Sequence, residues 1–244
     1  MKKRLLFLIA LFAASMFVMA EMTIYVYKKD GTKVQYAAAK VDSIGFAYYN
    51  PEYVDLGLPS GVLWAKCNLG ADSPEDYGDY FAWGETEPKL TYSWTDYKWC
   101  NGSYDSQTKY CASSSYGIVD NKSTLDLADD VANVYWGGNW RLPTKAELEE
   151  LINNCTCTRT SLNGVLGIEL ISKINGNSIF LPRAGRRSTE LNDTPDFGFY
   201  SSSSLKVDAS YYCFYLYLYY YGTGVAISEG SRSLGYSVRP VLVK

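Results

Sequence analysis

Six cysteines and many carboxylates are the side chains of this sequence with the clearest chemical potential, because the chain contains no histidine. Histidine is the usual general base near neutral pH, so catalysis of the Ser-His-Asp and Cys-His types is excluded. A thiolate nucleophile or a pair of carboxylates remains as an enzymatic alternative. No two carboxylates stand apart from the others, and a thiol such as Cys213 in an exported chain is more often part of a disulfide. We therefore predict no catalytic residue.

Acidic residues gather in two stretches, 72–87 and 120–130, and neither has the spacing of an EF-hand. Calcium takes about six to eight oxygen ligands and is an alternative for both stretches. For the first we favour a solvated loop anchored by Phe81 and Trp83, and for the second a short helix. Zinc is disfavoured because the sequence has no C-x-x-C spacing. We predict no cofactor and no metal ligand.

A tyrosine-rich run at residues 211–221 is the most informative stretch for function. In a strand, Phe214, Leu216 and Leu218 would lie on one face and alternate tyrosines on the other. If the first face meets the core, the phenol rings form an exposed strip that suits a protein or a sugar ligand. A strand packed beneath a loop is the competing interpretation. Serines flank the run, and the predicted ligand-binding residues are Tyr215, Tyr217, Tyr219, Tyr221, Ser228 and Ser231.

The elements that must position these residues centre on the stretch 136–152. Thr144 and Glu147 have the spacing of a capping box, which predicts a helix beginning directly after Thr144. Two glycines separate Trp136 from Trp140, so both indoles can anchor the core on a sharply turning backbone. The helix should bury one apolar face, formed by Leu148, Leu151 and Ile152.

Other stretches of the chain predict short strands and long connections. Strands and turns are expected at 53–58 and 62–65, a long loop at 91–118, a turn-rich segment at 155–167, and two strands at 168–172 and 178–181. Three arginines, Arg183, Arg186 and Arg187, follow the last strand. Nearby acids favour local ion pairs for them, and contact with an anionic ligand is the alternative.

The N-terminus predicts export. A basic start, an apolar run at 5–18 and small residues near position 20 are typical of a signal peptide spanning 1–20. The run is shorter than the ~20 residues of a membrane span, so we expect no span after cleavage, although a retained anchor is the alternative. A β-hairpin with an Asp-Gly turn follows in the segment 21–50, with a third strand at 41–46. The protein would be secreted or held at the cell surface.

Export favours disulfides among the six cysteines, and Cys100 with Cys111 would close one loop. The formal charge of -3 is low and the basic residues are scattered, which excludes a nucleic-acid partner. A chain of 244 residues with 47% hydrophobic content suits one medium domain with small additions.

Four motifs together resemble the Fibrobacter succinogenes major paralogous domain: V-D-L-G-L-P-S-G-V-L-W-A at 54–65, W-G-G-N-W-R-L-P-T at 136–144, N-G-N-S-I-F-L-P at 175–182 and G-Y-S-V-R-P-V at 235–241. The resemblance covers residues 52–243 and implies a C-type-lectin-like α+β domain at 51–244, with short antiparallel strands and one or two helices. The family has no general biochemical activity to transfer.

The resemblance also implies a further disulfide between Cys157 and Cys213, because this sequence departs from the family pattern at both of these positions. Lectin-like proteins diversified by retroelements vary in their final strands and loops, and the stretch 201–236 looks like such a product. In the closing motif Arg239, like Arg141, would have a structural role rather than contact a ligand.

The sequence thus favours a secreted or cell-surface binding module for an extracellular protein or glycan. Its Tyr/Ser-rich C-terminal surface would be the ligand face. A structural or assembly subunit of a surface appendage is the first alternative, and an enzyme of the formylglycine-generating or carboxylate-pair type is the second.

Overall fold

The computed structural model describes residues 23–27, 33–38, 51–221 and 224–244. Internal contacts divide the chain into two units, Met1–Tyr48 and Tyr49–Lys244, which are treated separately. The predicted signal peptide, the Asp-Gly turn and the predicted strand at 41–46 lie outside the described residues. Within the described part of the chain, no helix has the length and apolar character needed to cross a membrane.

The first unit contains two paired strands. β1 (Thr23–Tyr27) runs antiparallel to β2 (Lys33–Ala37), with Thr23 opposite Ala37 and Tyr27 opposite Lys33. The predicted pairing of a short hairpin is therefore present.

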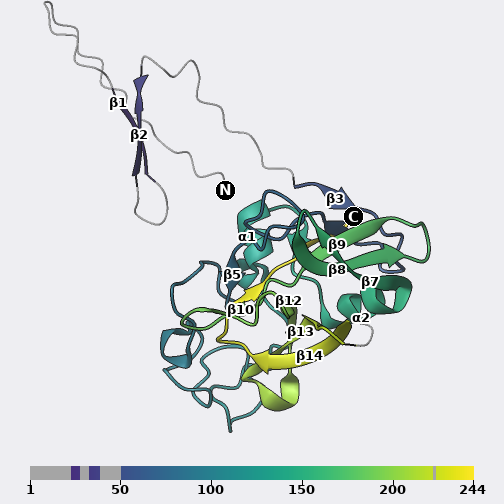
Figure 1. The fold of residues 1–244 in the computed structure, drawn as a ribbon. Helices are drawn as coiled ribbons and strands as arrows, with labels where there is room; N and C mark the ends of the chain where they lie inside the picture. Colours follow the sequence, from purple (N-terminus) through teal and green to yellow (C-terminus); the bar gives the residue numbers. More distant parts are fainter. Residues whose placement is uncertain (1–22, 28–32, 39–50, 222–223) are drawn as a thin grey trace, which may run out of the picture. The chain divides into compact units, whose positions relative to one another are not determined.

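The second unit is built from small, mainly antiparallel sheets, and its described residues include two α-helices (Figure 1). Its largest sheet has five strands, in the order β14 (Val225–Ser231), β13 (Tyr212–Leu218), β12 (Gly198–Leu205), β15 (Tyr236–Ser237) and β5 (Tyr80–Phe81). A second sheet brings both ends of the unit together, in the order β3 (Tyr53–Val54), β4 (Leu63–Ala65), β16 (Val241–Leu242) and β6 (Trp140–Arg141).

A third sheet has three strands, in the order β7 (Cys155–Leu162), β8 (Val165–Ser172) and β9 (Ser178–Pro182). A small two-stranded sheet pairs β10 (Arg186–Arg187) with β11 (Leu191–Asn192). The helices are α1 (Val131–Trp136) and α2 (Lys145–Asn154), and three 3-10 turns lie at Trp94–Asp96, Leu127–Asp129 and Val207–Ala209. The fold is thus a mixed one of small sheets and few helices, as predicted at this coarse level.

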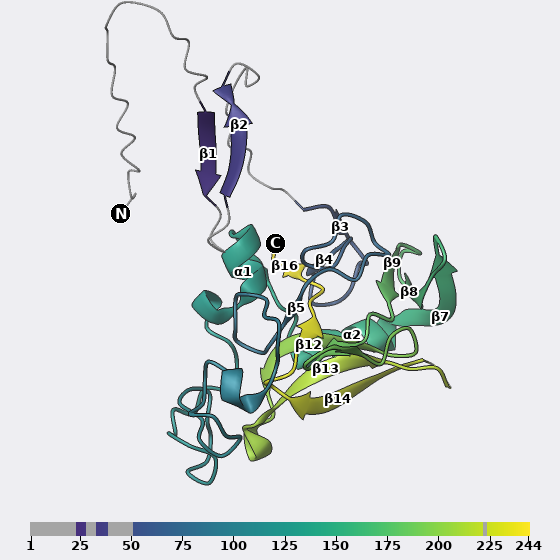
Figure 2. The same ribbon diagram turned by 60° about the vertical axis from the view of Figure 1, so that its left-hand side comes forward.

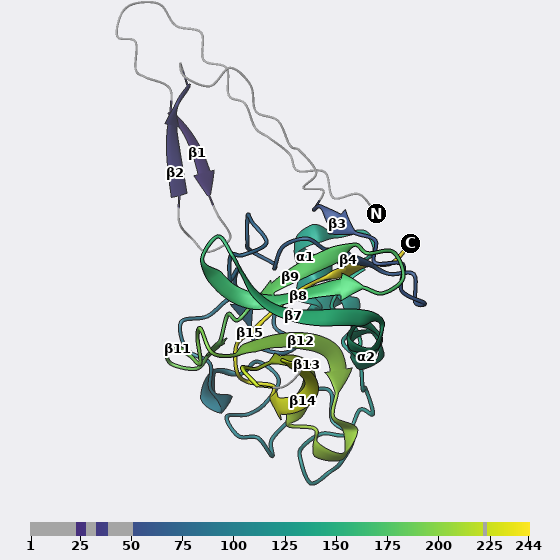
Figure 3. The same ribbon diagram turned by 45° about the vertical axis from the view of Figure 1, so that its right-hand side comes forward.

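The five-stranded sheet is buried on both faces. One face packs its aliphatic side chains, including Leu216 and Leu218, against α2 and the sheet β7–β8–β9. Figures 1 and 3 show α2 and the three-stranded sheet beside β12, β13 and β14. The other face packs aromatic side chains such as Phe199 into a core with Trp83 and Tyr110, which lie outside the sheet. The sheet therefore forms the middle layer between two hydrophobic cores.

Helix α2 begins as the sequence predicts. The Thr144 hydroxyl accepts a hydrogen bond from the backbone N–H of Glu147 at 3.2 Å, and the Glu147 carboxylate accepts one from the N–H of Thr144 at 2.7 Å. Arg141 adds a two-pronged ion pair to the same carboxylate, at 2.6 and 2.8 Å. One glutamate thus joins β6 to the start of α2.

The glycine pair between the two tryptophans permits a tight turn. Gly137 and Gly138 have φ values of 69° and 56°, which side-chain-bearing residues rarely adopt. The turn brings Trp136 and Trp140 into edge-to-face contact with ring centroids 4.9 Å apart. Trp140 is buried, whereas Trp136 is only partly buried, so the prediction of two core anchors holds fully for one of them.

Two predictions about connections have different outcomes. The acidic stretch near 130 does contain a short helix, and Asp130 caps it by accepting hydrogen bonds from Ala132 and Asn133. The segment 155–167, predicted to be turn-rich, instead forms most of the hairpin of β7 and β8. Its threonines alternate with other residues along the outer strand of the sheet, where one flank meets water.

We predict that Glu147→Gln lowers the free energy of unfolding by about 1 to 3 kcal/mol, because it removes a buried charged hydrogen-bond acceptor. Burial opposes ionisation of Glu147, yet the hydrogen bonds from Arg141 and Thr144 outweigh it and lower its pKa from the ordinary 4.5. The contribution is therefore complete above about pH 4.5 and disappears as pH falls through the folded-state pKa. Urea unfolding at several pH values measures both effects.

Glu149→Gln is the matched control, since Glu149 forms only an exposed i,i+4 pair with Lys145. It should change stability by less than about 0.5 kcal/mol. Equal losses in the two variants would contradict the role assigned to Glu147.

Candidate functional site

The four phenol rings that were predicted to form an exposed row differ in their exposure to solvent. Tyr215 is only 7% exposed and lies in the aromatic core, so its assignment to a ligand surface is wrong. Tyr217 is partly buried, stacked at 5.7 Å on Phe197 and tilted against Phe199 at 5.2 Å. Tyr219 is also partly buried, while Tyr221 is 73% exposed.

Tyr215 and Tyr217 are shielded from solvent because the face of β13 that carries them belongs to a second hydrophobic core. The prediction assumed that only the aliphatic face of β13 meets the interior, but the other face is covered as well. Burial of Tyr215 raises the pKa of its phenol, consistent with a ring removed from water. The competing interpretation, a tyrosine strand packed beneath other segments, therefore describes most of β13.

The predicted serines are not gathered at the exposed end. Ser228 and Ser231 lie on β14, opposite Tyr215 and Tyr212, and both are partly buried. Ser231 shares a hydrogen bond of 2.8 Å with Ser233, which is buried. The upstream serines of β12 are mostly buried too, at 201, 202 and 203.

An exposed aromatic site begins where β13 ends. Tyr220 and Tyr221 are 56% and 73% exposed, and their rings meet edge to face at 5.3 Å. Together with Arg159 and Arg183 they line an open groove of about 660 Å³. The remaining lining residues come from β7 and β8: Thr160, Ser161, Leu166 and Gly167.

Contacts within the groove join β7 to the end of the tyrosine run. Arg159 donates a hydrogen bond to the carbonyl of Tyr220. The guanidinium carbons of Arg159 and Arg183 lie 5.9 and 5.8 Å from the centre of the Tyr220 ring. These are cation–π distances, so the ring lies within reach of two positive charges. We take this groove as the candidate functional site.

Sequence reasoning missed Tyr220 and Arg159, and for Arg183 it preferred a local ion pair to the anionic ligand that it also considered. Tyr220 breaks the alternation on which the strand prediction rested, and Arg159 lies in the segment interpreted as turns. Arg183 was grouped with its neighbours as a local ion pair, yet only Arg186 forms one, with Asp193 at 2.7 Å. The alternating threonines around Arg159 are the signal that could have indicated an outer strand with a projecting cation.

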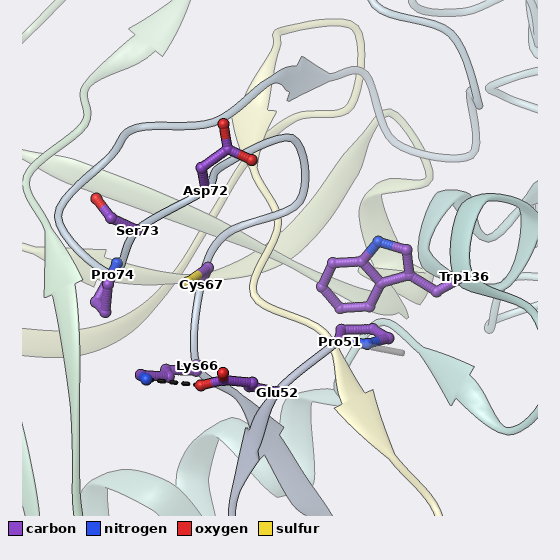
Figure 4. Close-up of a pocket in the computed structure, with 8 residues that line it drawn as sticks. All are labelled: Pro51, Glu52, Lys66, Cys67, Asp72, Ser73, Pro74 and Trp136. Carbon is purple, nitrogen blue, oxygen red and sulfur yellow. Dashed lines mark hydrogen bonds and ion pairs between the residues drawn. The ribbon is translucent and has the colours of Figure 1, made fainter. Parts of the chain in front are cut away.

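A second hollow, of about 320 Å³, lies near the start of the unit (Figure 4). Its walls include Trp136, the thiol of Cys67 and an ion pair of 2.6 Å between Lys66 and Glu52. Both charged side chains are largely exposed, so water screens the pair. Burial raises the pKa of Cys67, so the thiol stays protonated at neutral pH. This hollow offers no activated nucleophile, and the carboxylate of Asp72, which also lines it, has no ion-pair partner among the described residues.

The cysteines form no disulfide in the structure. All six are free, so the predicted pairs Cys100 with Cys111 and Cys157 with Cys213 are absent from the structure. Cys157 packs at the aliphatic core, whereas Cys213 belongs to the aromatic one. Cys213 is completely buried, which raises the pKa of its thiol to about 12. It is a core side chain rather than a nucleophile.

The acidic stretches form local ion pairs. Lys109 lies 2.6 Å from Asp129 and 2.7 Å from Asp126, and Lys89 lies 2.8 Å from Glu85. In the part of the chain that the structure describes, no group of three or more His, Cys, Asp or Glu side chains could hold a metal ion.

Comparisons with known proteins return nothing: no family model matches the chain, and neither a curated protein nor a solved structure is significantly similar to it.

We predict that native-state alkylation at pH 8 spares Cys111 and Cys213, because both thiols are fully buried. Their modification should be slower than that of the partly buried Cys67 by on the order of 100-fold, since local opening must come first. Mass spectrometry after alkylation, with and without denaturant, measures this.

Denatured protein treated without a reductant should carry six alkyl groups, because all six cysteines are free in the structure. Two or four missing groups would reveal disulfides and restore the prediction made from the sequence.

Proposed function

We propose that the chain is a secreted or cell-surface binding module that recognises an extracellular protein or glycan. The observation that carries this proposal is the pair of exposed rings, Tyr220 and Tyr221, on the wall of an open groove. Tyrosine gives a large contact area for two side-chain torsions and a hydroxyl that can pair with polar groups. Rings of this kind also stack on the C–H face of a sugar.

We further propose a C-type-lectin-like fold and membership of the Fibrobacter succinogenes major paralogous domain family. The four sequence motifs support this, and so does their placement. The 54–65, 136–144 and 235–241 motifs contribute strands to one sheet, β3–β4–β16–β6, or lead directly into it. Such a sheet joins the two ends of the domain. Sequence variation can then be confined to the strands and loops that lie outside it.

Catalysis is less well supported by the same observations. Cys213, the cysteine considered for formylglycine-generating chemistry, is buried with a raised pKa. Aspartate and glutamate are absent from the groove lining, so a carboxylate pair could not act there. The groove therefore favours binding over hydrolysis.

We predict that the double substitution Tyr220→Ala and Tyr221→Ala weakens ligand binding by at least about tenfold, because aromatic anchors dominate such contacts. The fold should be retained, since both rings are exposed. A glycan and surface-protein array probed with the full chain identifies the ligand, and calorimetry then gives the affinity of each variant.

Tyr53→Ala is the matched control, because Tyr53 is 50% exposed and lies on β3, outside the groove lining. Equal binding by wild type and the double variant would remove the basis of the proposal. A change in oligomeric state without a change in ligand binding would instead favour the assembly role.

A further inference from the structure

Three arginines of the second unit are at least nine-tenths buried, and in two of them every guanidinium nitrogen donates a hydrogen bond. Arg232 donates to the Tyr97 hydroxyl at 2.7 Å and to three backbone carbonyls at 2.8 to 2.9 Å. Arg239 donates to Asn68 at 2.9 Å and to three carbonyls at 2.6 to 3.2 Å. Each guanidinium is thus held by several acceptors aimed at its N–H groups.

Arg183 is the exception. It is only 6% exposed, and its Nε has no hydrogen-bond partner among the described residues. Its side chain makes one long hydrogen bond, from Nη1 to the carbonyl of Asp196 at 3.4 Å. The neighbouring Arg186 takes the nearby carboxylate of Asp193. Arg183 is therefore a buried cation without the acceptors that the other two possess.

A buried charge that lacks partners destabilises the folded state, so its presence calls for an explanation. The other lining residues of the groove supply no negative charge, because the ionisable acids Asp and Glu are absent from them. Arg159 adds a second guanidinium to the lining. The groove is a cationic site with an aromatic wall. The Nε of Arg183 is itself shielded from solvent, so a negatively charged ligand would pair with the terminal Nη groups, of which Nη2 donates no hydrogen bond to the described residues.

We propose that this groove binds an acidic saccharide, with its carboxylate on Arg183 and one ring face against Tyr220 and Tyr221. The proposal rests on the binding role proposed above and names the ligand class. A planar guanidinium matches a carboxylate through two parallel hydrogen bonds. The hydroxyls of Thr160 and Ser161 suit the polar edge of a sugar, and Leu166 is the one aliphatic side chain larger than a methyl in the lining. That composition fits a flat, polyhydroxylated ring better than a peptide side chain.

Arg183→Met tests the proposal, because methionine keeps much of the volume and removes the charge. The probes are trigalacturonate and sialyllactose, each compared with its own methyl ester, so that the two members of a pair differ by the carboxylate charge. We expect the full chain to bind at least one acid at least about tenfold more tightly than its uncharged counterpart. Arg183→Met should remove that preference while leaving the melting temperature unchanged or higher, since it deletes an unpaired buried charge.

Arg187→Met is the control for net charge, because Arg187 lies over the Tyr80 ring at 5.4 Å and does not line the groove. It should keep the preference for the acid. A fall of several degrees in melting temperature in Arg183→Met alone would overturn the proposal by making Arg183 structural.

The outcomes also separate this proposal from the binding role. Equal affinity for charged and uncharged probes, lost in the double variant of Tyr220 and Tyr221, would overturn the acidic class and leave the binding role standing. Tight binding of a peptide with a free carboxyl terminus, but of none of the saccharides, would overturn the saccharide class. Absence of any ligand on the glycan and protein arrays would overturn both.

Discussion

The central constraint of this structure is that one sheet is covered on both faces. β13 sends Leu216 and Leu218 to the core that contains α2 and Tyr215 to the core that contains Trp83, while β12 sends Tyr200 to the first core and Phe199 to the second. Successive side chains of a strand normally point alternately to the protein interior and to solvent, but here they point alternately to two hydrophobic cores. Tyr215 and Tyr217 of β13 therefore contribute to packing, and the exposed tyrosines of the run, Tyr220 and Tyr221, follow Leu218.

Covering the aromatic face requires a long segment of irregular chain, which is anchored by hydrogen bonds. Arg232 donates to the carbonyls of Lys109 and Tyr110, and the Asp120 carboxylate accepts from the N–H groups of Tyr110 and Cys111. The sequence predicted a disulfide between Cys100 and Cys111 for this purpose. A buried guanidinium does the same work, because it satisfies several carbonyls of an irregular loop from one point.

The predictable parts of the fold are those specified locally. The capping box at Thr144, the turn at Gly137 and Gly138, and the pairing of β8 with β9 follow from neighbouring residues, and the structure contains them. The burial of Tyr215 depends on tertiary packing, since its ring contacts Phe199 and Tyr236 and belongs to the same core as Trp83, so alternation alone could not reveal it. The groove is non-local in the same way, since Arg159, Arg183 and Tyr220 become neighbours only when two sheets meet.

The three buried arginines show how the same chemistry can serve structure or recognition. A guanidinium surrounded by carbonyls, as at Arg239, is a fixed part of the core, and burial lowers its pKa to about 10 without removing its charge at neutral pH. A guanidinium that lies beside an open groove and makes few hydrogen bonds, such as that of Arg183, lowers the stability of the folded protein instead. It costs stability in the free protein and recovers that cost only when an acceptor arrives. Because Arg183 directly follows β9, the rigid sheet fixes its position in advance, which limits the entropy lost on binding.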